Sequence, residues 1–314
     1  MSKIGSIAVD VKNLAITYQN GKKSVEDCSF AVHKGETVGL LGSNGAGKST
    51  ILRTIAGLNP NFDGRILVFG NSISTNLKLL KSKMAFVPQE SAFFMDFTVR
   101  ENLSYMMDAY NISGSAKNER IADLLKVFFL KPFENIRAKR LSGGYKQLLN
   151  VAMSFVIEPD LVLFDEPTVG LDITARKMFA DFIISLKKMR KTILITTHYL
   201  DEAQALCDKI VLLKDGKLVA YGSIGDLVLQ YGGRYTIILK FKALDEKLVS
   251  LCKTFKYSAL SGSNANYVYL TSDQKEIGEA IVELTEKLKE HKRMFEKIDV
   301  SEPSITEVFK EVMK

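Results

Sequence analysis

A glycine-rich loop between an apolar strand and a helix constrains the fold of this chain more than any other feature. Residues 42–49 read Gly-Ser-Asn-Gly-Ala-Gly-Lys-Ser, which matches the phosphate-binding pattern G-x-x-x-x-G-K-[ST] at every fixed position. The apolar run 37–41 precedes the loop and a helical stretch, 49–57, follows it. This order predicts a nucleoside triphosphate site at the end of a strand in an α/β fold.

The following residues alternate short apolar strands with helical stretches. Strands are expected at 84–87, 161–164 and 193–196, and the intervening helices predict a mostly parallel sheet covered on both faces. Residues 7–37 alternate as antiparallel strands do, with Asn20-Gly21 as a tight turn in which both residues have positive φ, and Asp215-Gly216 predicts a second hairpin. Residues 98–157 are mainly helical, which predicts a helical lobe inserted between two strands.

The pattern changes near Gly232-Gly233. Beyond it we expect a strand, a helix, two strands, a helix at 276–290 and a strand at 295–300, followed by a terminal helix. The order β-α-β-β-α-β predicts a small, ferredoxin-like α+β domain with an added C-terminal helix. The sequence thus predicts a nucleotide-binding domain at 1–230 and an accessory or regulatory domain at 231–314.

Composition excludes several classes of protein. No apolar run reaches the ~18–20 residues that span a bilayer, and Met1–Gly5 contains no apolar segment of a secretory signal. We therefore expect contact with a membrane only through a partner. Three scattered cysteines predict reduced thiols of a cytoplasmic protein, and three histidines are too few for a metal site.

The net charge of +7 is concentrated before residue 232, where Lys and Arg number 29 against 23 Asp and Glu. Nucleotide phosphates and anionic lipid headgroups are plausible neighbours for this excess, and a solubilising surface is the simpler explanation for most of it. Nucleic-acid binding is not expected, because no basic stripe is interleaved with aromatic residues.

The glycine loop predicts specific contacts with the nucleotide. Backbone N–H groups of residues 43–47 (Ser43, Asn44, Gly45, Ala46 and Gly47) would surround the β-phosphate at the start of the following helix. Lys48 would reach the β- and γ-phosphates, and the Ser49 hydroxyl would hold Mg²⁺. Thr50 would add a contact with the α-phosphate.

A second motif narrows the class of nucleotide-binding protein. Residues 141–147 read Leu-Ser-Gly-Gly-Tyr-Lys-Gln, and shortly afterwards an apolar strand ends in Asp165-Glu166. With the glycine loop, this combination resembles the ATPase subunit of an ABC (ATP-binding cassette) transporter over roughly residues 5–225. The resemblance implies ATP and Mg²⁺ as cofactors.

The resemblance also implies roles for single residues. Asp165 would bond the Mg²⁺ shell, Glu166 would orient and polarise the attacking water, and His198 would contact the γ-phosphate. Gln89 would touch Mg²⁺ and water and sense the membrane partner. Tyr18 would stack on adenine, although a core or edge-strand tyrosine remains the alternative.

The same resemblance predicts the number of subunits. Ser142, Gly143 and Gly144 would donate hydrogen bonds to a γ-phosphate held by a second subunit, and Asp172 would reach across the same interface. Because the chain carries one glycine loop and one Leu-Ser-Gly-Gly segment, two chains are required, and a homodimer is the simplest arrangement. Leu148 departs from the family pattern, which has arginine at that position.

The leading functional hypothesis is an ATPase that drives an integral membrane transporter subunit from the cytoplasmic face of the membrane. The resemblance implies that residues 90–110, which are rich in aromatic residues and methionine, line a groove for a helix of that partner. Some of these side chains, with Phe93 and Phe94 among them, would form this socket, while core packing is the alternative and is expected for at least half of them. The segment 302–309 resembles the ending of exporter ATPases, which favours export. The alternative is an ABC-type mechanotransmitter that regulates a membrane or cell-wall enzyme without transport. A soluble ABC protein of translation or DNA repair is disfavoured, because the chain has no second cassette.

Overall fold

The mostly parallel sheet predicted for the nucleotide-binding part is present. The computed structural model describes residues 6–231, 235–264, 266–272, 276–301 and 305–313. Within the first of these ranges, ten strands form one sheet in the order β5-β4-β1-β2-β10-β9-β3-β8-β7-β6. Its parallel part runs β9-β3-β8-β7-β6, and it comprises β3 (Thr37–Gly42), β6 (Met84–Val87), β7 (Leu161–Asp165), β8 (Thr192–Thr197) and β9 (Lys209–Lys214).

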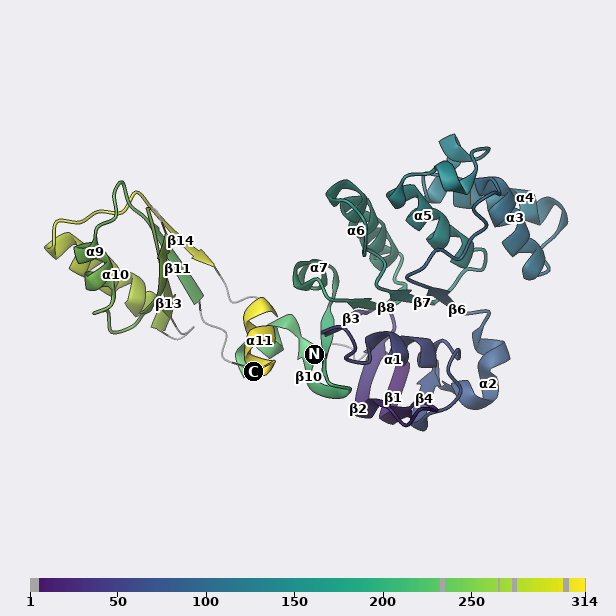
Figure 1. Cartoon of the computed structure of the whole chain (residues 1–314), viewed down its shortest axis with the longest axis horizontal. Coiled ribbons are helices and arrows are strands. Elements are labelled where there is room, and N and C mark those ends of the chain that lie inside the picture. Colours follow the sequence, from purple (N-terminus) through teal and green to yellow (C-terminus); the bar gives the residue numbers. More distant parts are fainter. Residues whose placement is uncertain (1–5, 232–234, 265, 273–275, 302–304, 314) are drawn as a thin grey trace. The chain divides into compact units, whose positions relative to one another are not determined.

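Helices cover both faces of these parallel strands, which explains their apolar sequences. Every residue of β3, β7 and β8 is buried, as expected for strands covered on both sides. One face carries α5 (Gly143–Ser154), α6 (Ile173–Lys188) and α7 (Leu200–Leu206), and the other carries α1 (Lys48–Ile55) (Figure 1). The carboxyl ends of β3, β7 and β8 therefore lie side by side at one edge, where ligand groups of such sheets are found.

Antiparallel strands enclose α1 from the other side. They are β1 (Ile7–Thr17), β2 (Lys23–His33), β4 (Asp63–Val68), β5 (Asn71–Ser72) and β10 (Lys217–Ser223), of which β2 and β10 pair with each other in parallel. The apolar side chains of all but β5 share one core with α1 and β3. The expected hairpin at Asp215-Gly216 is confirmed, since both residues have positive φ.

The turn at Asn20-Gly21 was predicted with the wrong geometry. Only Gly21 has a positive φ, and its N–H donates to the Tyr18 carbonyl. The connection between β1 and β2 spans five residues, 18–22, and a loop of this length needs one left-handed residue instead of two.

A helical lobe lies between β6 and β7 in the chain. It contains α3 (Val99–Ala109), α4 (Gly114–Val127), two short 3₁₀ turns (Lys131–Phe133 and Ala138–Arg140) and α5 (Figure 1). The first helix begins with a capping box: Glu101 N–H donates to Thr98 Oγ1, and Thr98 N–H donates to Glu101. Helix α2 (Ile73–Leu80) joins β5 to β6 outside the lobe.

Contacts divide the chain into two units, Met1–Ser223 and Ile224–Lys314. The sequence places this boundary later, at 230/231. The difference arises because α8 (Ile224–Gln230) packs against α11 (Ile305–Val312), which belongs to the second unit.

The second unit contains the β-α-β-β-α-β order expected from the sequence. Its elements are β11 (Tyr235–Lys240), α9 (Glu246–Cys252), β12 (Ala259–Asn264), β13 (Tyr267–Ser272), α10 (Ile277–Glu290) and β14 (Lys297–Ser301). Their antiparallel sheet has the order β12-β13-β11-β14, and α9 and α10 share a hydrophobic core with it. The start of the segment used to predict export, 302–304, lies outside the described residues.

In the ranges that the structure describes, no helix has both the length and the apolar character needed to cross a bilayer.

Candidate functional site

The glycine loop connects β3 to α1 and holds the lysine side chain inside itself. Lys48 is only 4% exposed, and its Nζ donates to the carbonyls of Gly42 (2.9 Å) and Ser43 (3.1 Å). Gly47 has φ 98°, and a Cβ there would lie 2.7 Å from the Ser24 carbonyl oxygen. Glycine is therefore required at this position for both its conformation and the close approach of β2.

The loop borders a pocket of about 260 Å³. Tyr18 lies at this pocket, half exposed, with its hydroxyl 2.8 Å from Thr50 Oγ1, which also accepts a hydrogen bond from Ser24. The structure thus brings together the predicted adenine-stacking residue, the loop and Glu166. The lining residues are Tyr18, Lys22, Ser24, Asn44, Gly45, Gly47, Lys48, Ser49, Thr50 and Glu166.

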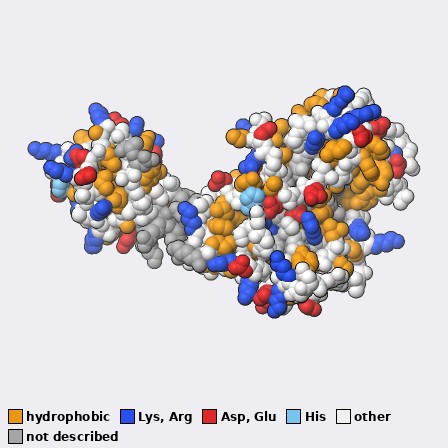
Figure 2. Space-filling view, viewed as in Figure 1, with side chains coloured by type: hydrophobic (Ala, Val, Ile, Leu, Met, Phe, Trp, Pro, Cys, Tyr) orange, Lys and Arg blue, Asp and Glu red, His pale blue; other side chains and the backbone are white. Residues whose placement is uncertain are grey.

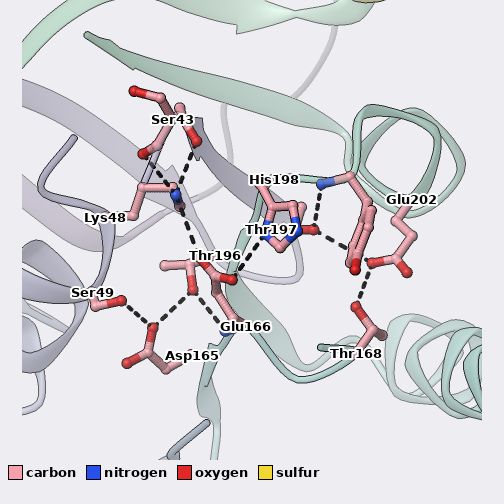
Figure 3. Close-up of polar contacts among 12 residues, drawn as sticks. Ser43, Lys48, Ser49, Asp165, Glu166, Thr168, Thr196, Thr197, His198 and Glu202 are labelled. Atoms are coloured by element: carbon pink, nitrogen blue, oxygen red, sulfur yellow. Dashed lines mark hydrogen bonds and ion pairs between the residues drawn. The ribbon is translucent and has the colours of Figure 1, made fainter. Parts of the chain in front are cut away.

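Asp165 and Ser49 meet at the end of β7 beside the start of α1. Ser49 Oγ donates to Asp165 Oδ1 at 2.6 Å, and Thr196 Oγ1 donates to the same oxygen at 3.0 Å (Figure 3). The other carboxylate oxygen, Oδ2, is buried without a hydrogen bond. Arg53 Nε lies 3.4 Å from Oδ2, within ion-pair distance but not aligned as a hydrogen bond.

This arrangement fits a bound Mg²⁺. The candidate donors are hard oxygens, a hydroxyl and a carboxylate whose buried Oδ2 accepts no hydrogen bond. Among the described residues no cluster of three or more His, Cys, Asp or Glu forms a metal cage. Mg²⁺ commonly binds through one or two protein groups, with phosphates and water completing its shell, so the residue set suits this ion.

Glu166 follows Asp165 in a left-handed backbone conformation, with φ 44°. Such a conformation costs roughly 1–3 kcal/mol in a residue other than glycine, and it persists where surrounding contacts hold it. One such contact is the hydrogen bond from Glu166 N–H to Thr196 Oγ1 (2.8 Å). The carboxylate lies between two cationic or polar partners: Lys48 Nζ is 3.4 Å from Oε1, and His198 Nδ1 is 2.9 Å from Oε2 (Figure 3).

Gln89 is not among the residues lining this pocket. It lies two residues after β6, and its side chain is exposed. Its proposed contact with Mg²⁺ and water therefore stays a prediction.

Ser142, Gly143 and Gly144 form the beginning of α5 and also stand apart from the pocket. Ser142 occupies the N-cap position without a side-chain capping bond, and both Ser142 and Gly143 are exposed. Gly144 has a packing role of its own, because a Cβ there would lie 2.8 Å from the Cβ of Ala175 on α6. The contact of Ser142, Gly143 and Gly144 with a nucleotide on a second subunit stays a prediction.

Asp172 caps its own helix. It is the N-cap of α6, and its Oδ1 accepts a hydrogen bond from Ala175 N–H at 2.7 Å. Its role at a subunit interface remains a prediction, and the capping bond gives the residue a function within the single chain as well.

Leu148, where the family pattern has arginine, is an apolar core residue. It is 4% exposed in α5 and borders an apolar pocket whose wall includes Phe128, Tyr145 and Phe182. An apolar side chain matches these neighbours, and Asp181 is the lining residue that carries a charge.

Several functional candidates were missed from the sequence. Thr196 joins Asp165 to the Glu166 backbone, and Glu202 accepts hydrogen bonds from Thr168 (2.7 Å) and Thr197 (3.4 Å) (Figure 3). The position of Thr196 at a strand end, two residues before His198, was a visible signal. The pairing of Glu202 with Thr168 is long-range, and no local pattern indicates it.

Comparison with known proteins gives one consistent result. A family model described as ABC transporter matches residues 25–169. The linearmycin resistance ATP-binding protein LnrL of Bacillus subtilis (strain 168) is 35% identical over 227 residues, covering 72% of this chain and 73% of that protein. The Nod factor export ATP-binding protein I of Rhizobium sp. (strain N33) is 33% identical over 274 residues, covering 87% and 89%.

Solved structures resemble the chain in the same way. An ATP-binding subunit of an ABC transporter superimposes with a TM-score of 0.63 at 31% identity, covering 71% of this chain and 93% of that one. The ATP-binding cassette MJ0796, in a dimeric post-hydrolysis state bound to ADP and Pi, gives a TM-score of 0.62 at 26% identity, covering 68% and 98%.

Proposed function

The chain belongs to the ABC transporter family as an ATP-binding subunit, and from this premise we propose that two copies close on two ATP molecules to drive an integral membrane partner. The chain is an ATPase of this family. The observation that carries the proposal is the convergence of Lys48, Glu166 and His198 beside the glycine-loop pocket, with Asp165 and Ser49 next to them.

Each of these groups has a role in phosphoryl transfer. Lys48 binds the β- and γ-phosphates. Ser49 and Asp165 would hold Mg²⁺, which would neutralise charge that develops on the phosphate oxygens. Glu166 orients the attacking water and accepts its proton. His198 keeps the Glu166 carboxylate in place and contacts the γ-phosphate.

The second subunit supplies the remaining contacts. The exposed start of α5, Ser142 and Gly143, donates to the γ-phosphate of ATP on the partner copy, and Asp172 lies at the same interface. The relative MJ0796 has been solved as a dimer, which supports this arrangement. Doubling the protein concentration should therefore more than double the rate of ATP hydrolysis. Ser142→Arg should abolish this dependence without abolishing ATP binding.

An exposed aromatic surface on the lobe is proposed to receive the membrane partner. Phe94, Met95, Phe97 and Tyr105 are each between 40% and 49% exposed, and the Phe94 ring lies 4.9 Å from the rings of both Phe97 and Tyr105. Hydrophobic side chains gather over α3 in the space-filling view (Figure 2). We refer to these four residues as the aromatic surface. The partner that we propose for it is an amphipathic helix of the membrane subunit, with this chain on the cytoplasmic face of the membrane.

Export is the direction that we propose. A relative that covers 87% of this chain, and so extends into the second unit, carries the name of a Nod factor export protein. LnrL is named for linearmycin resistance. The second unit also has an α+β arrangement instead of the all-β barrels typical of extended importer ATPases.

The experiment that tests this function is co-purification of the chain with its membrane partner, followed by reconstitution into vesicles. ATP-dependent movement of a ligand from the cytoplasmic to the opposite side supports export. ATP-dependent activation of an extracytoplasmic enzyme by the same complex, without movement of any ligand, would instead establish the mechanotransmitter alternative.

A further inference from the structure

A line of contacts connects the start of α6 to the segment that carries His198. Arg176 Nε donates to the carbonyl of Leu171 at 3.2 Å, and Arg176 Nη2 donates to the Tyr199 hydroxyl at 2.8 Å. The guanidinium carbon also lies 4.1 Å from the centroid of the Tyr199 ring. One side chain therefore binds the loop before α6 and the residue after His198 at the same time.

Tyr199 in turn contacts the His198 ring. The two ring centroids are 4.1 Å apart with an angle of 39° between the planes. The backbone N–H of Tyr199 donates to Thr197 Oγ1 at 3.0 Å, which holds the chain on both sides of His198. His198 Nδ1 lies 2.9 Å from Glu166 Oε2. The orientation of Tyr199 therefore affects the position of the His198 ring relative to the Glu166 carboxylate.

A second, independent contact joins the same two segments. Thr168 Oγ1, two residues after Glu166, donates to Glu202 Oε2 at 2.7 Å on α7. The loop 166–172 is thus attached to the segment 197–202 at two points, through Thr168–Glu202 and through Arg176–Tyr199. Neither pair lines the nucleotide pocket.

We propose that Arg176 and Tyr199 are a positioning pair that fixes the His198 ring against Glu166 and couples it to the loop 170–172. The proposal rests on the ATPase function above, and neither residue lines the nucleotide pocket. Arginine suits this role because its planar guanidinium stacks on an aromatic ring while its separate N–H groups bind two acceptors. Lysine can reproduce the charge over the ring but not both hydrogen bonds.

The test measures steady-state ATP hydrolysis by the purified full chain over a range of ATP concentrations. The variants are Arg176→Ala, Tyr199→Ala, the double variant, and the conservative Tyr199→Phe and Arg176→Lys. Lys177→Ala is the matched control, because Lys177 is the exposed neighbour of Arg176 on the same helix. Thermal unfolding and binding of a fluorescent ATP analogue are measured for every variant.

We expect each alanine variant to lose roughly tenfold in kcat with KM changed less than about twofold, as for a small misplacement of a reacting group. The double variant should be no slower than the slower single variant, because the two residues act through one contact. Tyr199→Phe keeps the ring stacking and should recover most of the lost kcat. Arg176→Lys keeps the charge over the ring but not both hydrogen bonds, so its kcat should stay several-fold below that of the wild type.

Three results would overturn the proposal: unchanged kcat in both alanine variants, losses that multiply in the double variant, or a rise in KM that accounts for the whole effect. If an alanine variant fails to fold, Arg176→Lys decides, since a kcat equal to that of Lys177→Ala would refute the pair. Failure of the wild-type chain to hydrolyse ATP would instead refute the proposed function.

Discussion

His198 and Glu166 are joined at 2.9 Å between Nδ1 and Oε2, and they come from the ends of two adjacent parallel strands, β8 and β7. The other oxygen of Glu166 lies 3.4 Å from Lys48 Nζ. Both carboxylate oxygens are thus held by partners from different elements. A base that must orient a water molecule benefits from such restraint, because little reorganisation is needed during the reaction.

Glu166→Gln removes the negative charge and the proton-accepting capacity but preserves the shape of the side chain. We expect hydrolysis to fall by roughly 10²–10⁴-fold, the usual contribution of a general base, while ATP binding is retained. In ATP and Mg²⁺ the variant should elute from size-exclusion columns as a dimer. Turnover at the wild-type rate would refute the assignment of Glu166 as the base.

Ser49→Ala removes the hydroxyl that donates to Asp165 Oδ1. Ser49 Oγ and the Asp165 carboxylate form the proposed Mg²⁺ site. The concentration of free Mg²⁺ needed for half-maximal hydrolysis should therefore rise by about tenfold, within the range seen when groups around a metal are removed. Ser49→Thr keeps the hydroxyl and serves as the control. Equal Mg²⁺ dependence in the alanine and wild-type proteins would show that Ser49 does not hold the ion.

Thr196→Val removes a buried hydroxyl that accepts from Glu166 N–H and donates to Asp165. The Glu166 N–H loses its acceptor and Asp165 Oδ1 keeps only its hydrogen bond from Ser49, so the free energy of unfolding should fall by about 1–3 kcal/mol. Urea denaturation checks this expectation, and kcat should fall as well because Glu166 loses a contact that holds its backbone. Thr196→Ser retains the hydroxyl and should remain near wild type in both measurements.

Phe94→Glu tests the aromatic surface, and the structure favours this residue over its neighbour. Phe94 is 46% exposed, whereas Phe93 is only 8% exposed, so a charge at Phe93 would disturb folding and could not report on docking. We expect Phe94→Glu to lower transport by the reconstituted complex while basal hydrolysis by the isolated chain is unchanged. If hydrolysis and transport decline together, the surface is not the docking site.

The cysteines provide a test of packing. Burial raises the pKa of the Cys28 and Cys207 thiols to about 12 and that of Cys252 to about 11, and the approach of Asp27 adds to the effect at Cys28. The thiolate is the reactive form, so a raised pKa means little reaction until the pH approaches these values. At about pH 8 a thiol reagent should label none of the three in the folded chain and all three in concentrated guanidinium, where the ordinary thiol pKa of about 8.5 returns. Rapid labelling of the folded protein would contradict this packing.

The phosphate loop shows what a local pattern can predict. The fixed residues of the loop, Gly42, Gly47, Lys48 and Ser49, all lie within eight positions. An apolar strand precedes them and an amphipathic helix follows them. The sequence alone therefore predicts the loop and its α/β context. The Asp215-Gly216 hairpin was equally local. At Asn20-Gly21 the same reasoning failed, because the length of the connection, and not the dipeptide, decided the backbone conformation.

By itself the sequence determined the phosphate loop, the parallel strands of the sheet, and the residues at the ends of those strands. These features depend on short-range periodicity and on fixed spacings between residues. Only the tertiary structure decided that Thr196 bridges Asp165 and Glu166 and that Arg176 reaches Tyr199. It also decided which of two adjacent phenylalanines is exposed. These contacts join residues that are distant in the chain or depend on how whole helices pack, and the packing energy that selects them is a property of the assembled fold.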